Sequence, residues 1–281
     1  MDKLSVILID VGWGDSILIE AGTEGNPRPR YGLIDSNDQE NLCSSFIFLK
    51  RYFERRKVQI PEDKPVFDFI ILTHFHADHG DGLKKIMREF GTKAFWYPKT
   101  SNPGGLSELI RFANRSDNVG FHEAVNSGKD FPALGPATGR FLWPPYSRDH
   151  QNIDASNENN NSVVLALTLG QVSFLLTGDA EGEVWEKIGT LPPDTHFFKV
   201  PHHGSVNGTF LGPAKATPWI DKCPGQALLG ISSHIRPFKH PHQEVVDLFR
   251  RLNRTVFRTD EHYHVTAETD GLNVKVKYSH I

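Results

Sequence analysis

Three histidines and an aspartate lie within six positions, directly after an apolar segment of the chain. The stretch ILTHFHADHG spans residues 71–80 and contains His74, His76, Asp78 and His79. Imidazole nitrogens and carboxylate oxygens are ligands that zinc and manganese accept. A polar loop with chance histidines is the alternative, but four such groups at the end of an apolar strand favour a metal site.

The spacing of this cluster suggests how it would hold two ions. If the strand continues briefly, His74 and His76 point to the same side because alternate residues of a strand share a face. A turn at Ala77 would then direct Asp78 and His79 towards a second ion. The sequence therefore predicts one ion on each side of this turn.

Other apolar segments also end in groups that bind metals. Asp179 follows FLLTG, the pair His202 and His203 follows FFKVP, and the asparagines of residues 159–161 precede the apolar segment 163–169. Taken alone, Asp179 would more readily be the N-cap of the helix that follows it. Together with the histidine cluster, these positions predict that several strands deliver ligands to one edge of a sheet.

Strands and helices alternate through the middle of the chain, which is typical of an α/β protein. Strands are expected at 4–9, 16–20, 31–35, 66–73, 93–98, 163–169, 172–176, 196–201, 227–232 and 255–259, with a final hairpin around 270–271. Helices are expected at 41–57, 82–90, 106–115, 181–189 and 243–252. A polar loop rich in Asn and Pro occupies 144–161, but no linker divides the chain, so residues 1–281 are expected to form one domain.

The composition argues against several classes of protein. The chain has 281 residues and a net charge of −3, so no overall charge draws it to nucleic acid or to an anionic membrane. No segment approaches the ~20 apolar residues of a transmembrane helix, and the first residues lack the pattern of a secretory signal. Cys43 and Cys223 are expected to be free thiols in a reducing, cytoplasmic setting.

The motifs DVGWGDSILIE, THFHADH, SVVLALTLGQVSFLLTGDAE, VPHHGS, HPHQEVV and RTDEHYHVT follow one another along the chain. THFHADH resembles the signature of metallo-β-lactamase-fold hydrolases, and the whole set is similar to the hydrolase domain of ComEC competence proteins. This resemblance implies a four-layer αββα sandwich with two divalent metal ions, Zn or Mn, at one edge. It also implies hydrolysis of a phosphate ester by a metal-activated water.

The resemblance assigns roles to individual residues. The implied metal ligands are His74, His76, Asp78, His79, Asn159, Asp179 and His203. The implied catalytic residues are Asp78, Asp179, His202 and His242. In this assignment His74 and His76 hold the first metal, Asp78 and His79 hold the second, and Asp179 bridges the two.

Three assignments have alternatives. Asn159 stands where many members of the fold have a further histidine, and Asn160 is the second choice for that position. His203 is taken as the ligand and His202 as the group that faces substrate, although the reverse order is open. His242 is either a phosphate contact or an exposed residue at a helix start.

Several neighbouring positions are interpreted without a direct metal role. Trp13 replaces the Gln of the usual Gly-Gln-Gly-Asp turn, and Asp15 and Asp35 are read as residues that orient ligand imidazoles. His262 and His264, in the last hairpin, are expected to be structural.

The expected function is cleavage of phosphodiester bonds by a nuclease, with DNA preferred to RNA. A basic groove beside the metals would be lined by Lys199, Arg236, Lys239 and Arg258. One alternative is a small-molecule phosphodiesterase. Another is a metal-stabilised subunit of a larger defence or DNA-uptake complex, with a protein interface on the helix at 41–57 through Phe46, Phe48 and Phe53. No membrane partner is expected, and the sequence leaves the oligomeric state open.

Overall fold

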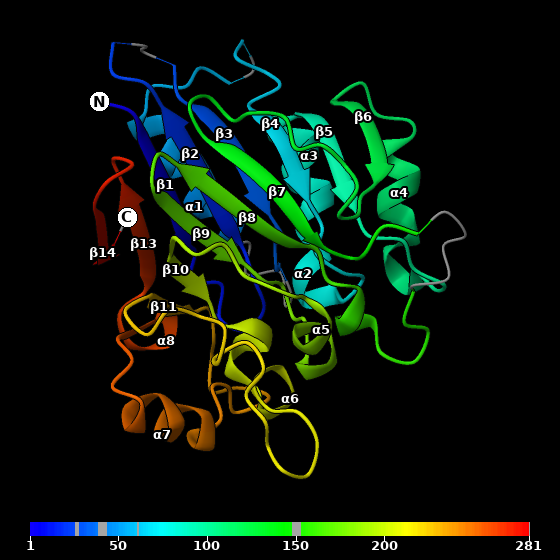
Figure 1. Cartoon of the computed structure of the whole chain (residues 1–281). Coiled ribbons are helices and arrows are strands. Elements are labelled where there is room, and N and C mark those ends of the chain that lie inside the picture. The colour runs from blue at the N-terminus through cyan, green and yellow to red at the C-terminus, as the bar shows by residue number, and fades with distance from the viewer. Residues whose placement is uncertain (26–27, 39–43, 61, 148–152, 281) are drawn as a thin grey trace.

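Two β-sheets pack face to face, with helices on the outer side of each, in the computed structural model of the chain (Figure 1). The structure describes residues 1–25, 28–38, 44–60, 62–147 and 153–280. The four layers confirm the predicted αββα sandwich. Across these residues, no helix combines the length and the apolar character that crossing a bilayer requires.

Eight strands form the larger sheet within the described residues. They are β1 (Lys3–Leu8), β2 (Ile17–Gly22), β3 (Arg30–Ile34), β4 (Phe67–Ile71), β5 (Thr92–Tyr97), β6 (Val119–Ala124), β13 (His264–Thr269) and β14 (Val274–Ser279). Their order is β14-β13-β1-β2-β3-β4-β5-β6. Pairing is antiparallel from β14 to β3 and parallel from β3 to β6.

Six strands form the smaller sheet in the same part of the chain. They are β7 (Thr138–Trp143), β8 (Val164–Leu169), β9 (Val172–Leu176), β10 (Thr195–Lys199), β11 (Leu228–Ile231) and β12 (Val256–Arg258). Their order is β12-β11-β10-β9-β8-β7, with parallel pairing from β9 to β12. The parallel strands β9, β10 and β11 bring their carboxyl ends to one edge of this sheet.

Helices cover the outer faces of both sheets (Figure 1). The larger sheet is covered by α1 (Ser44–Arg55), α3 (Leu83–Phe90) and α4 (Ser107–Ala113). The smaller sheet is covered by α5 (Gly182–Lys187) and α7 (Gln243–Arg251), next to α6 (Val206–Thr209). Short helical turns complete the described elements: α2 (Ala77–Gly80), α8 (Thr259–His262), η2 (Gly104–Leu106), η3 (Glu158–Asn161) and η4 (Pro201–Gly204).

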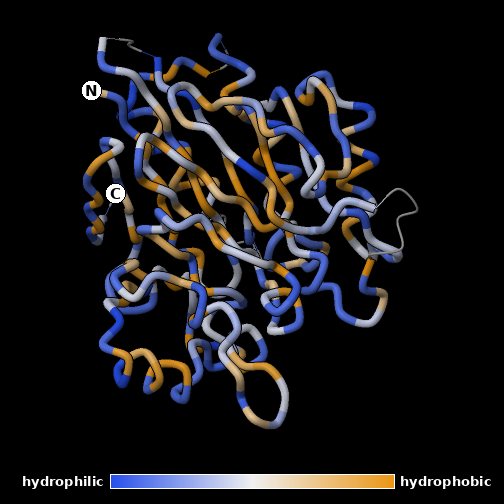
Figure 2. Tube along the Cα trace, in the orientation of Figure 1, coloured by the Kyte–Doolittle hydropathy of each residue, from blue (hydrophilic) through white to orange (hydrophobic). Residues whose placement is uncertain are grey.

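The alternating strand pattern divides the core into three layers of apolar contact. Leu4, Val6 and Leu8 of β1 point between the two sheets, whereas Ile7 and Ile9 point towards the helices of the larger sheet. Successive strand residues face opposite sides, so one strand contributes to two core layers. Figure 2 shows the resulting concentration of hydrophobic residues along the central strands.

The structure also corrects details of the predicted elements. β6 and β7 were not expected, because each carries several polar or exposed residues and lies at the edge of its sheet. The predicted strand 66–73 ends at Ile71, where the Thr73 amide donates to Asp35 Oδ1 at 2.7 Å instead of to a neighbouring strand. His74 and His76 therefore follow the strand on a loop, not on a continued β-face.

Two predictions fall partly outside the described residues. The expected start of the helix at 41–57 includes residues 41–43, which lie outside the described residues, and so does Cys43 with its predicted free thiol. Cys223 is a buried free cysteine, as expected. On α1, the rings of Phe48 and Phe53 are buried and Phe46 packs against the same core, so these three do not form an outward aromatic surface.

Candidate metal centre

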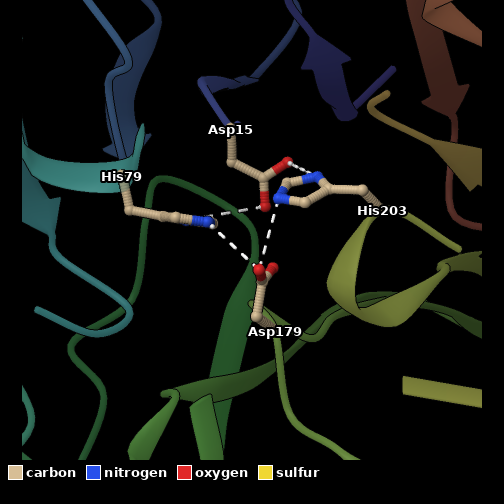
Figure 3. A group of neighbouring side chains, drawn as sticks. All are labelled: Asp15, His79, Asp179 and His203. Atoms are coloured by element: carbon tan, nitrogen blue, oxygen red, sulfur yellow. Dashed lines mark ion pairs between the residues drawn. The ribbon is translucent and has the colours of Figure 1, made fainter. Parts of the chain in front are cut away.

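Segments that are distant in the sequence meet at one end of the sandwich, where the strands of both sheets lead into loops. Asp15 precedes β2, His79 lies in α2, Asp179 follows β9, and His203 lies in η4 after β10. One ligand atom from each of these four buried side chains lies within 4.8 Å of the others. Figure 3 shows the four side chains pointing towards a common centre.

The turn that carries Asp15 requires glycine at position 14. Gly14 has a φ of +92°, which L side chains rarely adopt, and a Cβ there would lie 2.2 Å from the backbone oxygen of Asp78. The Asp15 amide then donates to that same Asp78 oxygen at 3.2 Å. The first turn of the chain is thereby attached to the loop that contains the histidine cluster.

The HHGS segment adopts a strained turn that aims its two histidines differently. His202 and His203 have positive φ values of 47° and 54°, a conformation that is uncommon for non-glycine residues and often found at functional sites. His203 is 4% exposed and points into the centre, whereas the His202 side chain is 21% exposed and borders the cleft. This geometry favours the predicted order, with His203 as the ligand.

Contacts at Nδ1 fix the ring orientations of His79 and His203. His79 Nδ1 is 2.7 Å from Asp35 Oδ2, and His203 Nδ1 is 2.8 Å from the backbone oxygen of Ser232. A carboxylate or carbonyl behind a ligating histidine sets its tautomer and leaves Nε2 for the metal. Asp35 therefore has the orienting role that the sequence predicted for it.

The atoms of these residues that face the centre fit a divalent cation. His79 Nε2 and His203 Nε2 lie 3.3 and 3.2 Å from Asp179 Oδ2, and Asp78 Oδ2 is within 3.7 and 3.9 Å of the same two nitrogens. Both Nε2 atoms are buried without a hydrogen-bond partner among the described residues. Unpartnered buried polar atoms are costly, and an ion between two imidazoles and two carboxylates would remove that cost.

The pKa shifts of Asp179 and its neighbours also favour a cation-binding centre. Burial by itself would raise the pKa of Asp179, but His203, His79 and His202 hold it well below its usual range. Burial lowers the pKa of His79, yet Asp179, Asp78 and Asp35 outweigh burial and raise it well above 6.5. Without a bound cation, protons on these imidazoles would balance the buried carboxylates, and a cation would replace those protons.

Lys199 does not line a groove, and the prediction that it contacts nucleic acid is wrong. The side chain is fully buried beneath the centre, where Nζ lies 2.6 Å from Asp15 Oδ2, 3.0 Å from the Gly178 oxygen and 3.9 Å from Asp179 Oδ1. Its ammonium group balances the negative charge of the Asp15 and Asp179 carboxylates. Asp15 thus belongs to the convergent group while being held by Lys199, a pairing that no sequence pattern indicated.

Arg258 also has a different role from the predicted one. Its guanidinium pairs with Asp260 at 2.6 Å and with Glu261 at 3.0 Å. By contrast, Arg236 and Lys239 are exposed, on the segment between β11 and α7. Of the four cations expected in a basic groove, these two remain accessible.

The second part of the predicted site surrounds His74 and His76. His74 is fully buried, with Nδ1 3.1 Å from Thr73 Oγ1 and Nε2 3.0 Å from Nδ1 of the exposed His76. Burial, together with His79, lowers the pKa of His74 well below 6.5, so its ring is neutral near pH 7. The ring centroids of His74 and His79 are 4.2 Å apart, which places this pair beside the convergent group.

The two candidate asparagines lie in different surroundings. Asn159 lines the same cleft as His76 and Asp179, and its Oδ1 is buried without a partner among the described residues. Asn160 instead donates from Nδ2 to Asp154 Oδ2 at 2.9 Å and lines a separate hollow with Trp143. Asn159 is therefore the asparagine that the structure brings to the candidate site.

Glu181 is a site residue that the sequence reading missed. Its Oε1 accepts from Asn159 Nδ2 at 2.8 Å and lies 3.1 Å from His202 Nδ1, so one carboxylate orients both side chains. With its Nδ2 bound to Glu181, Asn159 keeps its oxygen for a cation. Its position, two residues after Asp179 in TGDAE, could have marked Glu181 as a site residue.

A cleft of about 530 Å³ opens onto these residues. His240 and His242 form part of its wall. Trp13, which is partly exposed, and Phe238, which is exposed, also line it, and we refer to this pair as the rim. Burial and the neighbouring His203, His202 and His242 lower the pKa of His240 to about 3. His242 accepts the Val206 amide through Nδ1 at 3.0 Å, so its position in the cleft wall includes a structural hydrogen bond.

Comparison with known proteins agrees with this geometry. The profile described as Metallo-beta-lactamase superfamily matches residues 4–215. The chain belongs to the metallo-β-lactamase superfamily. It is a hydrolase of this superfamily with a candidate metal site, and the predicted fold is confirmed.

Two relatives and one solved structure are similar to this chain. ComE operon protein 3 of Bacillus subtilis is 29% identical over 266 residues, which are 91% of this chain and 32% of that protein. Recombination protein 2 of Haemophilus influenzae is 25% identical over 197 residues, 69% of this chain and 21% of that protein. The chain thus spans about a third or less of these relatives. Yeast PDE1 has a TM-score of 0.52 at 11% identity, with 94% and 99% of the two chains covered, and shows the fold alone.

The histidines of the final hairpin lie away from the centre, as predicted for His262 and His264. His264 Nδ1 accepts the Asp10 amide at 3.0 Å, and burial lowers the His264 pKa to about 4. His262 packs edge-on against Tyr278, with ring centroids 4.7 Å apart. Both side chains therefore have structural contacts.

Proposed function

We propose that this metallo-β-lactamase-superfamily chain is a metal-dependent phosphodiesterase that cleaves nucleic acid, with DNA as the preferred substrate. The observation that carries the proposal is the set of unpartnered ligand atoms on His79, His203 and Asn159 beside an open cleft. Two divalent ions bound there would acidify a water molecule and neutralise the charge of a phosphodiester.

The chain's own residues supply binding and orientation. Asp35 and the Ser232 carbonyl hold two imidazoles in place, and Lys199 holds Asp15 beneath the centre. His202 is fixed by Glu181 at one nitrogen, while its Nε2 lies 3.8 Å from Asp179 Oδ2. His202 is therefore positioned to contact a phosphoryl oxygen next to the ions, and Asp78 or Asp179 to accept a proton during attack.

Two observations favour nucleic acid as the substrate. Arg236 and Lys239 are exposed on the segment that continues into the cleft wall at His240, where they can meet a phosphate backbone. One relative is named Recombination protein 2, and recombination is a process of DNA. A local pair of cations suffices for this role even though the chain carries a net charge of −3.

A small phosphodiester is the second candidate substrate. The cleft of about 530 Å³ lies within the range of roughly 300–1,000 Å³ that is usual for small-molecule sites. In that case the walls would enclose most of the ligand, and the exposed cations would contribute little.

Cleavage assays on labelled DNA, labelled RNA and a chromogenic phosphodiester, combined with metal analysis, test the proposal. We expect DNA cleavage that depends on bound metal and is abolished in His76→Ala and Asp78→Ala, because both side chains lie at the cleft. Full activity in these two variants would contradict the proposal that the chain is a metal-dependent phosphodiesterase. A chain that binds metal but cleaves none of the substrates would instead be a metal-stabilised subunit.

The substrate class is tested by removing the two exposed cations. Arg236→Ala and Lys239→Ala should weaken DNA binding and reduce its salt dependence, while cleavage of the chromogenic substrate is unchanged. Lys275→Ala, at an exposed position of β14, is the matched control. Equal loss on both substrates would favour the small phosphodiester.

A further inference from the structure

The rim of the metal cleft carries an aromatic pair that the chemistry described above does not use. Trp13 and Phe238 both line the cleft, and their ring centroids are 5.2 Å apart with the planes at 74°. The two residues come from the turn before β2 and from the segment between β11 and α7. They meet only because both segments fold against the centre.

Phe238 is not explained by core packing. Its side chain is 55% exposed, and the neighbouring Ile235 is 64% exposed. Among the large apolar residues that are exposed in the described part of the chain, Phe238 is the one that lines this cleft. An exposed phenylalanine beside metal ligands gains little from burial and is available to a ligand.

The backbone beneath Trp13 is held rigidly. The Gly12 amide donates to Asp10 Oδ1 at 3.1 Å, and the Trp13 carbonyl accepts from the Asn37 side chain. Trp13 remains partly exposed. A ring on a fixed backbone loses little freedom when a ligand stacks on it, which favours binding.

Aromatic rings continue from this pair to the centre. The ring centroids of Phe238 and His240 are 6.0 Å apart, and those of His240 and His203 are 6.1 Å apart. A base that rests on the rim would therefore place an adjoining phosphate near His203. The exposed Arg236 and Lys239 flank Phe238 in the sequence and supply positive charge beside the same rim.

We propose that Trp13 and Phe238 form a stacking platform for an unpaired nucleobase, which directs the chain to single-stranded nucleic acid. This inference rests on the proposed function. Two rings at a steep angle accept a flat base, with one ring against its face and the other against its edge. A base paired inside a duplex has no free face, whereas single-strand binding commonly combines aromatic stacking with basic side chains.

Intrinsic fluorescence gives a readout that does not depend on cleavage. Of the five tryptophans, Trp96, Trp143, Trp185 and Trp219 are buried, and only Trp13 is accessible. The full chain is titrated with a short oligothymidylate carrying phosphorothioate linkages, which resist hydrolysis, and with a base-free oligomer of the same length. We expect the thymidylate to quench the fluorescence and to bind more tightly, by about tenfold. Equal binding and equal quenching by the two oligomers would overturn the platform.

Variants locate the effect. Phe238→Leu should lower thymidylate affinity by about tenfold and leave binding of the base-free oligomer unchanged. Trp13→Leu should do the same when a labelled oligomer is followed by fluorescence anisotropy. Phe121→Leu is the matched control, because Phe121 is 50% exposed on β6 and lies outside the cleft lining. Equal losses on both oligomers, or a similar loss in the control, would contradict the proposal.

A duplex and the cleavage assay complete the test. A blunt duplex of the same sequence should quench Trp13 only weakly, and quenching as strong as that by the single strand would overturn the preference for unpaired bases. Base-dependent quenching in a chain that cleaves no phosphodiester would contradict the proposed function while supporting the platform. The two ideas can therefore fail separately.

Discussion

The candidate centre has two unlike halves. The inner half consists of Asp78, His79, Asp179 and His203, and the outer half of His74, His76 and Asn159. In the inner half both histidines are buried and are held at Nδ1 by other groups. In the outer half His76 is exposed, contacts His74 directly, and shares the half with an amide in place of a further imidazole.

This difference concerns preorganisation as well as ligand type. Side chains that are already fixed lose little conformational freedom when an ion binds, whereas His76 must be ordered and separated from His74. We therefore expect the inner half to bind its ion more tightly and the outer half to exchange its ion more readily. The four predictions below test this comparison, from the largest effect to the smallest.

Removing the carboxylate that faces both halves should have the largest effect. Asp179→Ala is expected to lose most of both ions and to lower phosphodiester cleavage by at least about a thousandfold. Elemental analysis and single-turnover assays measure the two effects. Asp194→Ala, at the opposite end of β10, is the control. A variant that keeps a tightly bound inner ion would show that Asp179 does not join the halves.

Lys199 tests whether the inner half depends on its buried support. Lys199→Met should lower the free energy of unfolding by about 3–5 kcal/mol, because it leaves the Asp15 carboxylate buried without its 2.6 Å partner. The substitution should also reduce metal binding by the inner half more than metal binding by the outer half. Urea unfolding and metal titration measure both, with the exposed Lys275→Met as control. Unchanged stability would show that the pair does not support the centre.

Asn159 tests whether ligand type limits the outer half. Asn159→His replaces an amide oxygen by imidazole and should tighten the outer ion by about tenfold, or roughly 1.4 kcal/mol. Asn160→His should leave metal affinity unchanged, since Asn160 faces Asp154 in a separate hollow. Competition with a chelating dye measures the affinities. The opposite result for the two variants would reverse the assignment of the asparagines.

The smallest expected effect is a difference between the two halves in the number of protons released when an ion binds. Although burial lowers them, the pKa values of His79 and His203 lie above 6.5 because of nearby carboxylates, so in the metal-free chain both rings carry protons below those values. An inner ion must displace these protons, so its affinity should fall by up to about tenfold per pH unit for each displaced proton as pH drops from about 7.5 to 6. His74, with a pKa well below 6.5, releases none.

Calorimetry in buffers of different ionisation enthalpy measures this release. One to two protons per inner ion are expected from His79 and His203. Proton release that is equal for both ions would remove the proposed electrostatic distinction between the halves.

The fold was largely predictable from local patterns. Apolar runs in strands such as β1 and the helical spacing of Leu83, Ile86 and Phe90 depend on near neighbours, so they indicated the correct elements. β6 and β7 escaped prediction because edge strands need no continuous apolar face. Their pairing with β5 and β8 comes from tertiary contacts.

The candidate ligands were also visible in the sequence. His74 to His79 lie within one short segment, and Asp179 and His203 each follow an apolar strand, so residue type and position marked them as candidates. The resemblance to the family assigned their roles and left the order of His202 and His203 open. The sequence did not decide between Asn159 and Asn160, because adjacent residues of the same type differ only in the neighbours that they contact. Glu181 and Asp154 are the neighbours that separate them.

What the sequence determined by itself was most of the strands and helices, apart from the edge strands β6 and β7, and the identity of the groups at their ends. Only the tertiary structure decided that Lys199 lies beneath the centre instead of in a groove, and that Trp13 meets Phe238 at the rim. The physical reason is that the role of a charged or aromatic side chain depends on its burial and partners. Those partners, Asp15 for Lys199 and Phe238 for Trp13, come from distant segments that only folding brings together.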